Sequence, residues 1–312
     1  MDPTESLGVV AHPGGLLVRR PELTVGVVRA VSGLSALEIE LLARRPLDRR
    51  SATVAIRELL PAYDEGVDLR VGWLDHAGRA HWEFATSCSS SSGDHLVGPT
   101  CRAVFRLPPT FDQLSLVLAW PEIGFPETVV TMPLPGRTTV ERTTTSIWQA
   151  PLDVRPVPEG LTHHADRRHG APAVEAGTNV ASPRVLHRGD HHVAVVLTRL
   201  TVVNSLLCME LLSIAKGDAA DAINAVAFPP PTPDDPAQLR AAGPGASVAV
   251  VQGHEAFWGW PGDGGTSGGD QTFSCLQEFT LSRPDDDLLD LIVAWPLAGL
   301  HDVRVLIPLG PA

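Results

Sequence analysis

One set of residues has the types and the chain order of a serine hydrolase. Ser267 lies in Gly-Thr-Ser-Gly-Gly at 265–269, and an acidic run at 285–287 and then His301 follow it. In α/β-hydrolases the serine of a Gly-x-Ser-x-Gly pattern stands between an apolar strand and a helix. Here it lies in a low-complexity stretch between expected strands, where such a match arises easily by chance. We therefore expect no catalytic residue and keep a hydrolase using Ser267 as a remote alternative.

Histidines and carboxylates are also candidate metal ligands. Six of the twelve histidines fall in one short segment: His163, His164, His169, His187, His191 and His192. Their separations do not share a helix face, and Arg167 and Arg168 between them would repel a cation. The acidic run at 285–287 has no further ligands at calcium-binding spacing, so a solvated turn explains it better. We expect no metal and no other cofactor.

Three aromatic residues are the candidate binding residues. Phe257, Trp258 and Trp260 lie in Glu-Ala-Phe-Trp-Gly-Trp-Pro-Gly beside a Gly-rich stretch, and alternating tryptophans share one face of a strand. If that face is exposed, it is a patch for a partner, a small molecule or a carbohydrate. If it faces the interior, the three residues belong to the core.

The elements that carry these residues are repeated along the chain. LSLVLAWPEIGFPETVVTMPL at 114–134 resembles LDLIVAWPLAGLHDVRVLIPL at 289–309. Farther upstream, 24–43 aligns without gaps on 194–213, and 101–107 aligns on 275–281. The matches keep their order, and the period is too long for a solenoid of about 20–50-residue units. We therefore expect a tandem duplication, with each repeat forming a domain.

Each repeat contains a Trp-Pro pair at the end of an expected strand. Proline has no N–H for a sheet ladder, and the glycine that follows lets the chain reverse. A stacking platform and a buried plug are both conceivable for the two tryptophans. We expect the plug, because tryptophan is mostly buried in folded proteins. The structural residues predicted for these corners are Trp120, Pro121, Gly124, Trp295, Pro296 and Gly299.

Short runs rich in Val, Ile, Thr, Phe and Trp, separated by turn residues, predict an all-β fold. We expect two antiparallel β-sandwiches, immunoglobulin-like or jelly-roll-like, at 14–149 and 184–312. Residues 150–183 are rich in Pro, Gly, Ala and His, and we expect a linker that is poorly ordered or held only by surface contacts. Ser-rich and Gly-rich loops are expected at 87–99 and 261–271. Short helices are plausible at 51–63 and 217–228.

The stretch LVLAWPEIGFPET resembles a signature of uncharacterised actinobacterial proteins in which Trp-Pro is followed by Gly, then Pro-Glu-Thr, and later by a further tryptophan. The matching residues are Trp120, Pro121, Gly124, Pro126, Glu127, Thr128 and Trp148. Ala119 departs from the acidic residue of that signature, and the second repeat lacks Pro-Glu-Thr. That family has no assigned activity, so the resemblance implies an organisation and carries over no catalytic residue.

Composition narrows the possible partners. The formal net charge of −12 argues against general nucleic-acid binding. The apolar stretch 193–215 is interrupted by Arg199, Asn204 and Glu210, so a buried hairpin explains it better than a membrane span. The N-terminal residues do not resemble a signal peptide, and four cysteines suggest reduced thiols in the cytoplasm. Cys88 and Cys101 could pair only under oxidising conditions.

The function expected from these patterns is non-enzymatic. Two similar sandwiches without a convergent acid, base, nucleophile or metal set point to an interaction or structural subunit whose partners are other protein chains, a homo-oligomer among the possibilities. The alternative is a module that binds a small molecule or a carbohydrate through exposed Trp258 and Trp260.

Overall fold

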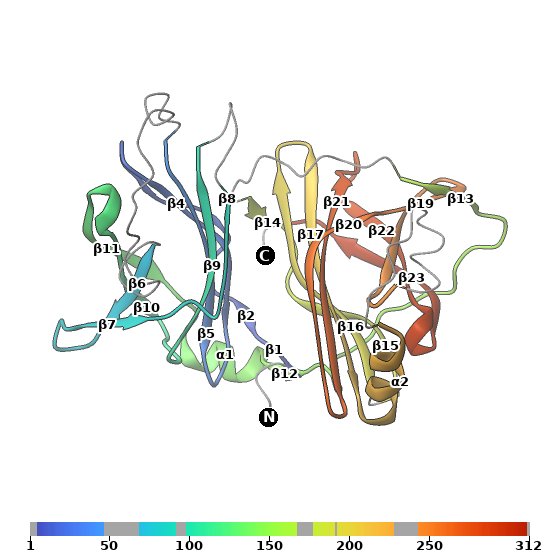
Figure 1. Cartoon of the computed structure of the whole chain (residues 1–312). Helices are drawn as coiled ribbons and strands as arrows, with labels where there is room; N and C mark the ends of the chain where they lie inside the picture. The colour runs from blue at the N-terminus through green and yellow to red at the C-terminus, as the bar shows by residue number, and fades with distance from the viewer. Residues whose placement is uncertain are drawn as a thin grey trace. The chain divides into compact units, whose positions relative to one another are not determined.

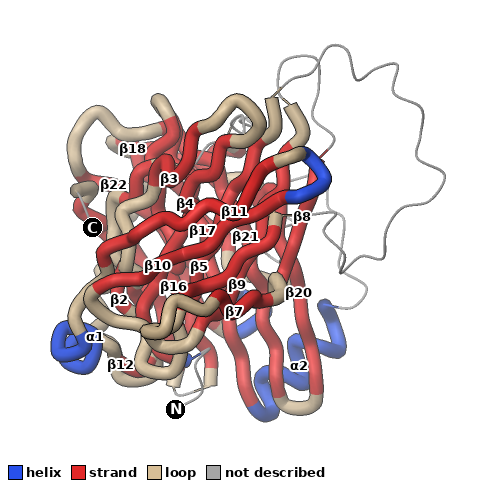
Figure 2. The backbone as a smooth tube through the Cα atoms, turned by 90° about the vertical axis from the view of Figure 1, so that its left-hand side faces the viewer, coloured by secondary structure: helices blue, strands red, loops and turns tan. Residues whose placement is uncertain are grey.

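A computed structural model describes residues 5–46, 69–91, 98–166, 177–190, 192–227 and 243–310. Strands dominate this part of the chain, and Figure 2 shows how little of the backbone is helical. The chain divides into two compact units. The N-terminal unit contains the described residues between 8 and 144 together with Gly177. The C-terminal unit contains the described residues 5–7, 145–166 and 178–310.

The N-terminal unit is built from two antiparallel sheets (Figure 1). The larger sheet has the order β2-β4-β5-β9-β8, with β3 also paired to β4, and the smaller has the order β11-β10-β6-β7. The strands of the larger sheet are β2 (Val9–Val10), β3 (Gly15–Arg19), β4 (Thr24–Ser32), β5 (Leu37–Arg44), β8 (Ser87–Ser91) and β9 (Thr100–Leu107). Those of the smaller sheet are β6 (Arg70–Leu74), β7 (Ala80–Glu83), β10 (Gln113–Trp120) and β11 (Phe125–Pro133), and helix α1 (Arg137–Thr143) follows.

The C-terminal unit has the corresponding pair of sheets (Figure 1). The larger has the order β14-β16-β17-β21-β20, with β15 also paired to β16, and the smaller has the order β13-β19-β18-β22-β23. The larger sheet contains β14 (Thr178–Asn179), β15 (Arg184–Gly189), β16 (Val193–Val203), β17 (Leu206–Lys216), β20 (Pro261–Gly269) and β21 (Thr272–Ser282). The smaller contains β13 (Thr162–Ala165), β18 (Ser247–Gln252), β19 (Glu255–Trp258), β22 (Leu288–Trp295) and β23 (Leu300–Pro308).

One hydrophobic core fills each unit between its two sheets. In the N-terminal unit Ile39 and Phe105 of the larger sheet and Leu116 of the smaller belong to the same buried cluster. In the C-terminal unit a cluster of the same kind joins strands of both sheets with helix α2 (Gly217–Ala227). Two sheets that enclose one core form a β-sandwich, so the prediction of an all-β sandwich fold is confirmed.

The two units also share strand register. Arg29 of β4 pairs with Glu40 of β5 directly after a register shift, and Arg199 of β16 pairs with Glu210 of β17 after a shift at the same place. These are the residues that the sequence alignment of 24–43 on 194–213 matches. A common topology and register are what a duplication predicts, and that the two units arose by duplication stays an inference.

Both Trp-Pro corners have the predicted structure. Trp120 and Trp295 end β10 and β22, and each proline begins a 3₁₀ turn, η3 (Pro121–Ile123) or η4 (Pro296–Ala298). Gly124 and Gly299 then adopt left-handed φ angles of 72° and 74°, which favour glycine. Trp120 is 6% exposed and Trp295 is fully buried. The prediction that these tryptophans are buried rather than exposed platforms is confirmed.

The apolar stretch 193–215 forms the expected hairpin of β16 and β17. Helix α2 confirms the helix predicted at 217–228 as far as Ala227, whereas the helix predicted at 51–63 lies outside the described residues. No helix in the described part of the chain has the length and apolar character needed to cross a membrane.

The structure corrects the prediction of a poorly ordered linker at 150–183. Thr162–Ala165 forms β13, Thr178–Asn179 forms β14, and Arg155 bridges to Arg304 of β23. The expectation of poor order is therefore wrong for these residues, and His169 lies outside the described part. The physical reason is that Val157 and Leu161 pack against a buried cluster of the smaller sheet that contains Trp258 and Ile292, which helps offset the cost of ordering the segment.

The structure also corrects the prediction of Ser-rich and Gly-rich loops at 87–99 and 261–271. Ser87–Ser91 forms β8 and Pro261–Gly269 forms β20, each an outer strand of a larger sheet. Side-chain composition favours loops at both places, but the backbone ladders with β9 and β21 stabilise strands instead.

The β8–β9 pair brings Cys88 and Cys101 together, with their sulfurs 3.6 Å apart. We expect a diazene oxidant to convert these two thiols to a disulfide, with the oxidant reduced to the hydrazine, while Cys208 and Cys275 stay reduced. Burial raises the pKa of the Cys275 thiol, which lowers its content of reactive thiolate. Intact mass and peptide mapping measure the result. Cys88→Ser is the control, and a disulfide that includes Cys275 would contradict the expectation.

Candidate functional site

The predicted aromatic residues lie near the edge of the smaller sheet of the C-terminal unit, beside its outer strand β13. Trp258 is only 5% exposed, and its indole Nε1 donates to Nδ1 of His163 at 3.0 Å. The ring of Phe257 stacks on that of His164 with centroids 5.4 Å apart. Strand β13 therefore covers this edge with two of the clustered histidines.

Backbone hydrogen bonds also hold β13 in this position. Strand β13 runs parallel to β19, with Ala165 opposite Trp258, and the N–H of Asp166 donates to the carbonyl of Trp258 at 2.9 Å. The indole of Trp260 donates to the carbonyl of Asp166 at 3.2 Å. The sequence left open whether these residues are exposed or belong to the core. The chain's own segment occupies this site, and Trp258 is buried and Trp260 half-buried.

A second aromatic pair lies at the corresponding edge of the N-terminal unit, as its ladder shows. Val117 of β10 pairs with Gly72 of β6, and Gly72 pairs with Trp82 of β7. Val117 lies three residues before Trp120, which ends β10. Phe84 follows two residues after Trp82.

The C-terminal unit repeats this ladder position by position. Ile292 of β22, three residues before Trp295, pairs with Ala249 of β18, and Ala249 pairs with Trp258. Trp82 and Trp258 therefore occupy equivalent positions in the two sheets, and Phe84 corresponds to Trp260. Trp82 and Phe84 are not among the residues predicted from the sequence, although His-Trp-Glu-Phe at 81–84 and Phe-Trp-Gly-Trp at 257–260 share a visible aromatic pattern.

The two equivalent sites differ in whether another strand pairs beside the aromatic residues. Within the described part of the N-terminal unit, β7 is the outer strand of its sheet. Trp82 is 41% exposed and Phe84 is 80% exposed, unlike Trp258. Gly72 leaves room for β7, since a methyl group there would meet the carbonyl oxygen of His81 at 2.7 Å and the indole of Trp82 at 3.1 Å. The N-terminal unit thus presents an exposed aromatic pair beside an outer strand.

A pocket of about 280 Å³ lies next to this pair. Its lining combines the indole of Trp82 with the Trp-Pro corner and two groups of opposite charge, and includes Arg70, Trp82, Pro121, Gly124, Pro126 and Glu127. Pro121 and Gly124 were predicted from the sequence to be structural residues of the Trp-Pro corner. The structure shows that this corner also shapes the wall of a pocket.

The turn between β6 and β7 holds the outer strand in place. Asp75 accepts hydrogen bonds from the backbone N–H groups of Ala77 and Arg79 and contacts Nε2 of His81 at 3.0 Å. His81 stacks on Trp73 with centroids 4.5 Å apart. The hydrogen bond from His81, followed by the backbone bonds, lowers the pKa of Asp75 from 3.8 to about 2. This contact therefore contributes fully above about pH 4 and is lost as the pH falls through 2.

The residues of the hydrolase alternative do not form a triad. Ser267 lies inside strand β20, opposite Ser274, and not at a strand-to-helix turn. His301 lies on β23, which belongs to the other sheet, and its backbone carbonyl contacts the ring of His187 at 2.8 Å. The nucleophile-elbow interpretation is therefore incompatible with the local structure.

The remaining metal candidates do not converge. Among the described residues no three His, Cys, Asp or Glu side chains gather where they could hold a metal ion. The acidic run at 285–287 lies in a bend, where Asp287 contacts Arg283 at 3.7 Å. His191 lies outside the described residues, as does His169.

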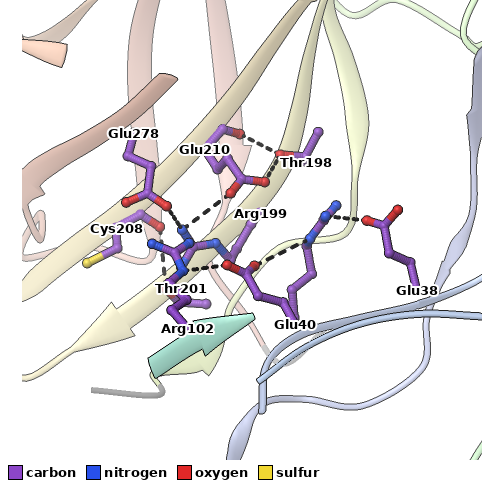
Figure 3. A network of polar contacts seen from close by, with 10 residues as sticks. Glu38, Glu40, Arg102, Thr198, Arg199, Thr201, Cys208, Glu210 and Glu278 are labelled. Atoms are coloured by element: carbon purple, nitrogen blue, oxygen red, sulfur yellow. Dashed lines mark hydrogen bonds and ion pairs between the residues drawn. The ribbon is translucent and has the colours of Figure 1, made fainter. Parts of the chain in front are cut away.

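Buried charges on the larger sheets have structural partners (Figure 3). Arg199 donates to Glu278 at 2.6 Å and lies 3.5 Å from Glu210. The hydroxyl of Thr198 donates to Glu210. In the N-terminal unit, Glu40 accepts from Arg102. These ion pairs and hydrogen bonds join neighbouring strands of the same sheet, although Nε of Arg199 and Oε2 of Glu40 find no hydrogen-bond partner among the described residues.

Comparisons with known proteins show no functional relationship. No family model matches the chain, and no curated protein matches it. One solved structure, a conserved domain protein from Bacillus anthracis, aligns over 96% of this chain and 91% of its own with 9% identity and a TM-score of 0.24. A likeness at that score supports no argument about function.

Proposed function

We propose that the chain is a non-enzymatic protein-interaction subunit that binds other proteins through the aromatic edge of its N-terminal unit. The observation that carries the proposal is the exposure of Trp82 and Phe84 beside outer strand β7 and a pocket. Exposed aromatic side chains near a pocket are typical anchors of protein interfaces. The net charge of −12 favours protein partners over nucleic acid. The proposed place of action is the cytoplasm, where free cysteines are common.

Outer strands support the same proposal. A strand with one unpaired edge can accept an extended chain through its backbone groups, and side-chain pockets then select the sequence. Arg70 and Glu127 place charges of both signs at the pocket, which suits a polypeptide. The carbohydrate alternative has less support, because sugar stacking needs an accessible ring, and Trp258 is buried beside β13 and Trp260 is half-buried.

Site-specific photo-crosslinking tests the proposal. Phe84 is replaced by a benzophenone-bearing phenylalanine in the native cell, and cross-linked products are separated by mass. We expect discrete protein adducts that disappear when Trp82→Ala is added, because the indole forms one side of the interface. A product of twice the subunit mass identifies a second copy of the chain as the partner.

The matched control carries the same photoreactive residue at Val226, which is 54% exposed on helix α2. Adducts that form equally well at positions 84 and 226, or that persist in Trp82→Ala, contradict the proposal. Melting curves of both labelled proteins verify that the substitutions leave the fold intact.

A further inference from the structure

We infer that the partner adds a parallel strand beside β7, with a hydrogen-bond acceptor on Trp82 and an acidic residue next to it. The inference rests on the proposed function. It adds the orientation and register of the partner strand and the chemistry of the side chains that it should carry. Its basis is strand β13, the segment that already occupies the equivalent edge of the C-terminal unit.

Strand β13 supplies the parallel orientation, and the backbone geometry of Trp82 is compatible with it. The carbonyl of Trp258 accepts from Asp166 of the parallel strand, although Trp258 also lies opposite Ala249 in an antiparallel ladder. In such a ladder the N–H and C=O of one residue point to the same side, so those of Trp258 point outward. Trp82 has the same place in its ladder with Gly72. An incoming strand with the direction of β13 therefore meets the outward backbone groups of Trp82.

Side chains on one face of β13 define the first part of the partner's chemistry. Leu161 packs against the cluster that contains Trp258, and His163 accepts the indole N–H. Among the described residues no group accepts a hydrogen bond from the indole of Trp82, which is 41% exposed. The partner segment should therefore carry an apolar residue and, two positions later, an acceptor such as imidazole, carboxylate or amide.

The opposite face of β13 defines the second part, because the two units differ there in charge. His164 stacks on Phe257 and contacts Glu255 at 3.2 Å. The ladder positions equivalent to Phe257 and Glu255 are His81 and Arg79 in the N-terminal unit. Arg79 replaces a carboxylate with a guanidinium that is 79% exposed and whose Nε pairs with Asp75 at 3.2 Å. An acidic residue at the position of His164 can pair with its other N–H groups.

Two synthetic peptides test the inference on the full chain. One has the sequence of residues 157–166 with a fluorescent label, and the second carries His164→Glu. We expect the second to bind roughly two- to five-fold more tightly, as an exposed ion pair contributes. We expect Trp82→Ala to weaken both peptides about tenfold or more, as loss of an aromatic anchor does. Fluorescence anisotropy measures both changes.

Leu16→Ala is the matched control, since Leu16 is 56% exposed on β3 of the larger sheet. It should leave the affinity of both peptides unchanged. Arg79→Ala should remove the preference for the acidic peptide while leaving the binding of the unmodified peptide close to its original value.

Cysteine cross-linking tests the orientation. Glu83→Cys places a thiol at the C-terminal end of β7, and peptides carry at either end a cysteine activated as a mixed disulfide with thionitrobenzoate. A parallel strand predicts faster thiol–disulfide exchange, with release of thionitrobenzoate, at the C-terminal cysteine of the peptide. Faster reaction of the N-terminal cysteine overturns the inference.

Two further results overturn it: binding that Trp82→Ala leaves unchanged, and no binding of either peptide up to about 1 mM. These failures are distinguishable from failure of the proposed function. Photo-crosslinking at position 84 that depends on Trp82, combined with peptides that do not bind, would leave a protein-interaction site and exclude a β13-like partner.

Discussion

Trp295→Ala should lower the free energy of unfolding of the C-terminal unit by about 3–5 kcal/mol. The indole is fully buried and packs against Phe273, with ring centroids 6.0 Å apart. Among the described residues its Nε1 finds no hydrogen-bond partner, so the loss comes from packing and from the cavity that remains. Urea denaturation followed by circular dichroism measures the effect. The two units can unfold in separate transitions, each of which is then fitted by itself.

The matched control is Trp82→Ala, which removes the same side chain from the exposed edge of the N-terminal unit. Since Trp82 already exposes 41% of its surface to water, its removal should destabilise clearly less than that of Trp295. Trp295→Phe should fall between wild type and Trp295→Ala. Equal losses for Trp82→Ala and Trp295→Ala would show that the corner tryptophan has no special role in the core.

Arg199→Met should destabilise the C-terminal unit by about 3–5 kcal/mol, the second large effect. The substitution removes a guanidinium that lies 3.5 Å from the buried carboxylate of Glu210. Glu278 is partly exposed, so water can solvate it and Glu278→Gln should cost no more than about 1 kcal/mol. Denaturation of the three proteins measures these differences.

A double-mutant cycle separates the missing charge from lost packing. Arg199→Met combined with Glu210→Gln removes both charges, and we expect it to recover a large part of the stability lost in Arg199→Met. If the double variant is as unstable as the sum of the two single variants, the two side chains do not act as a pair.

Local rules let the sequence predict much of the architecture. Alternating apolar residues give strands, a proline without an N–H ends β10 and β22, and a glycine with positive φ reverses the chain after each. Matches between the two halves predicted which residues hold equivalent places, including Arg29 and Arg199. These features depend on neighbours in the chain or on pairing register, and both leave a pattern in the residue types.

The linker and the Gly-rich segment show where such rules fail. Pro261–Gly269 has the composition of a loop, but β21 supplies a row of backbone partners that its sequence does not reveal. Thr162–Ala165 resembles a solvated segment, and its order comes from β19, a strand far along the chain. In both cases the stabilising groups belong to the partner strand.

The sequence alone determined the sandwich class and the two Trp-Pro corners, and it contains an aromatic pair at equivalent places in the two repeats, in 81–84 and 257–260. Only the tertiary structure decided which pair is open: Trp258 lies under β13, whereas Trp82 and Phe84 are exposed. The physical reason is that exposure of an outer strand depends on whether another segment pairs with its edge. That pairing is a long-range contact, and the residue types at 81–84 and 257–260 do not contain it.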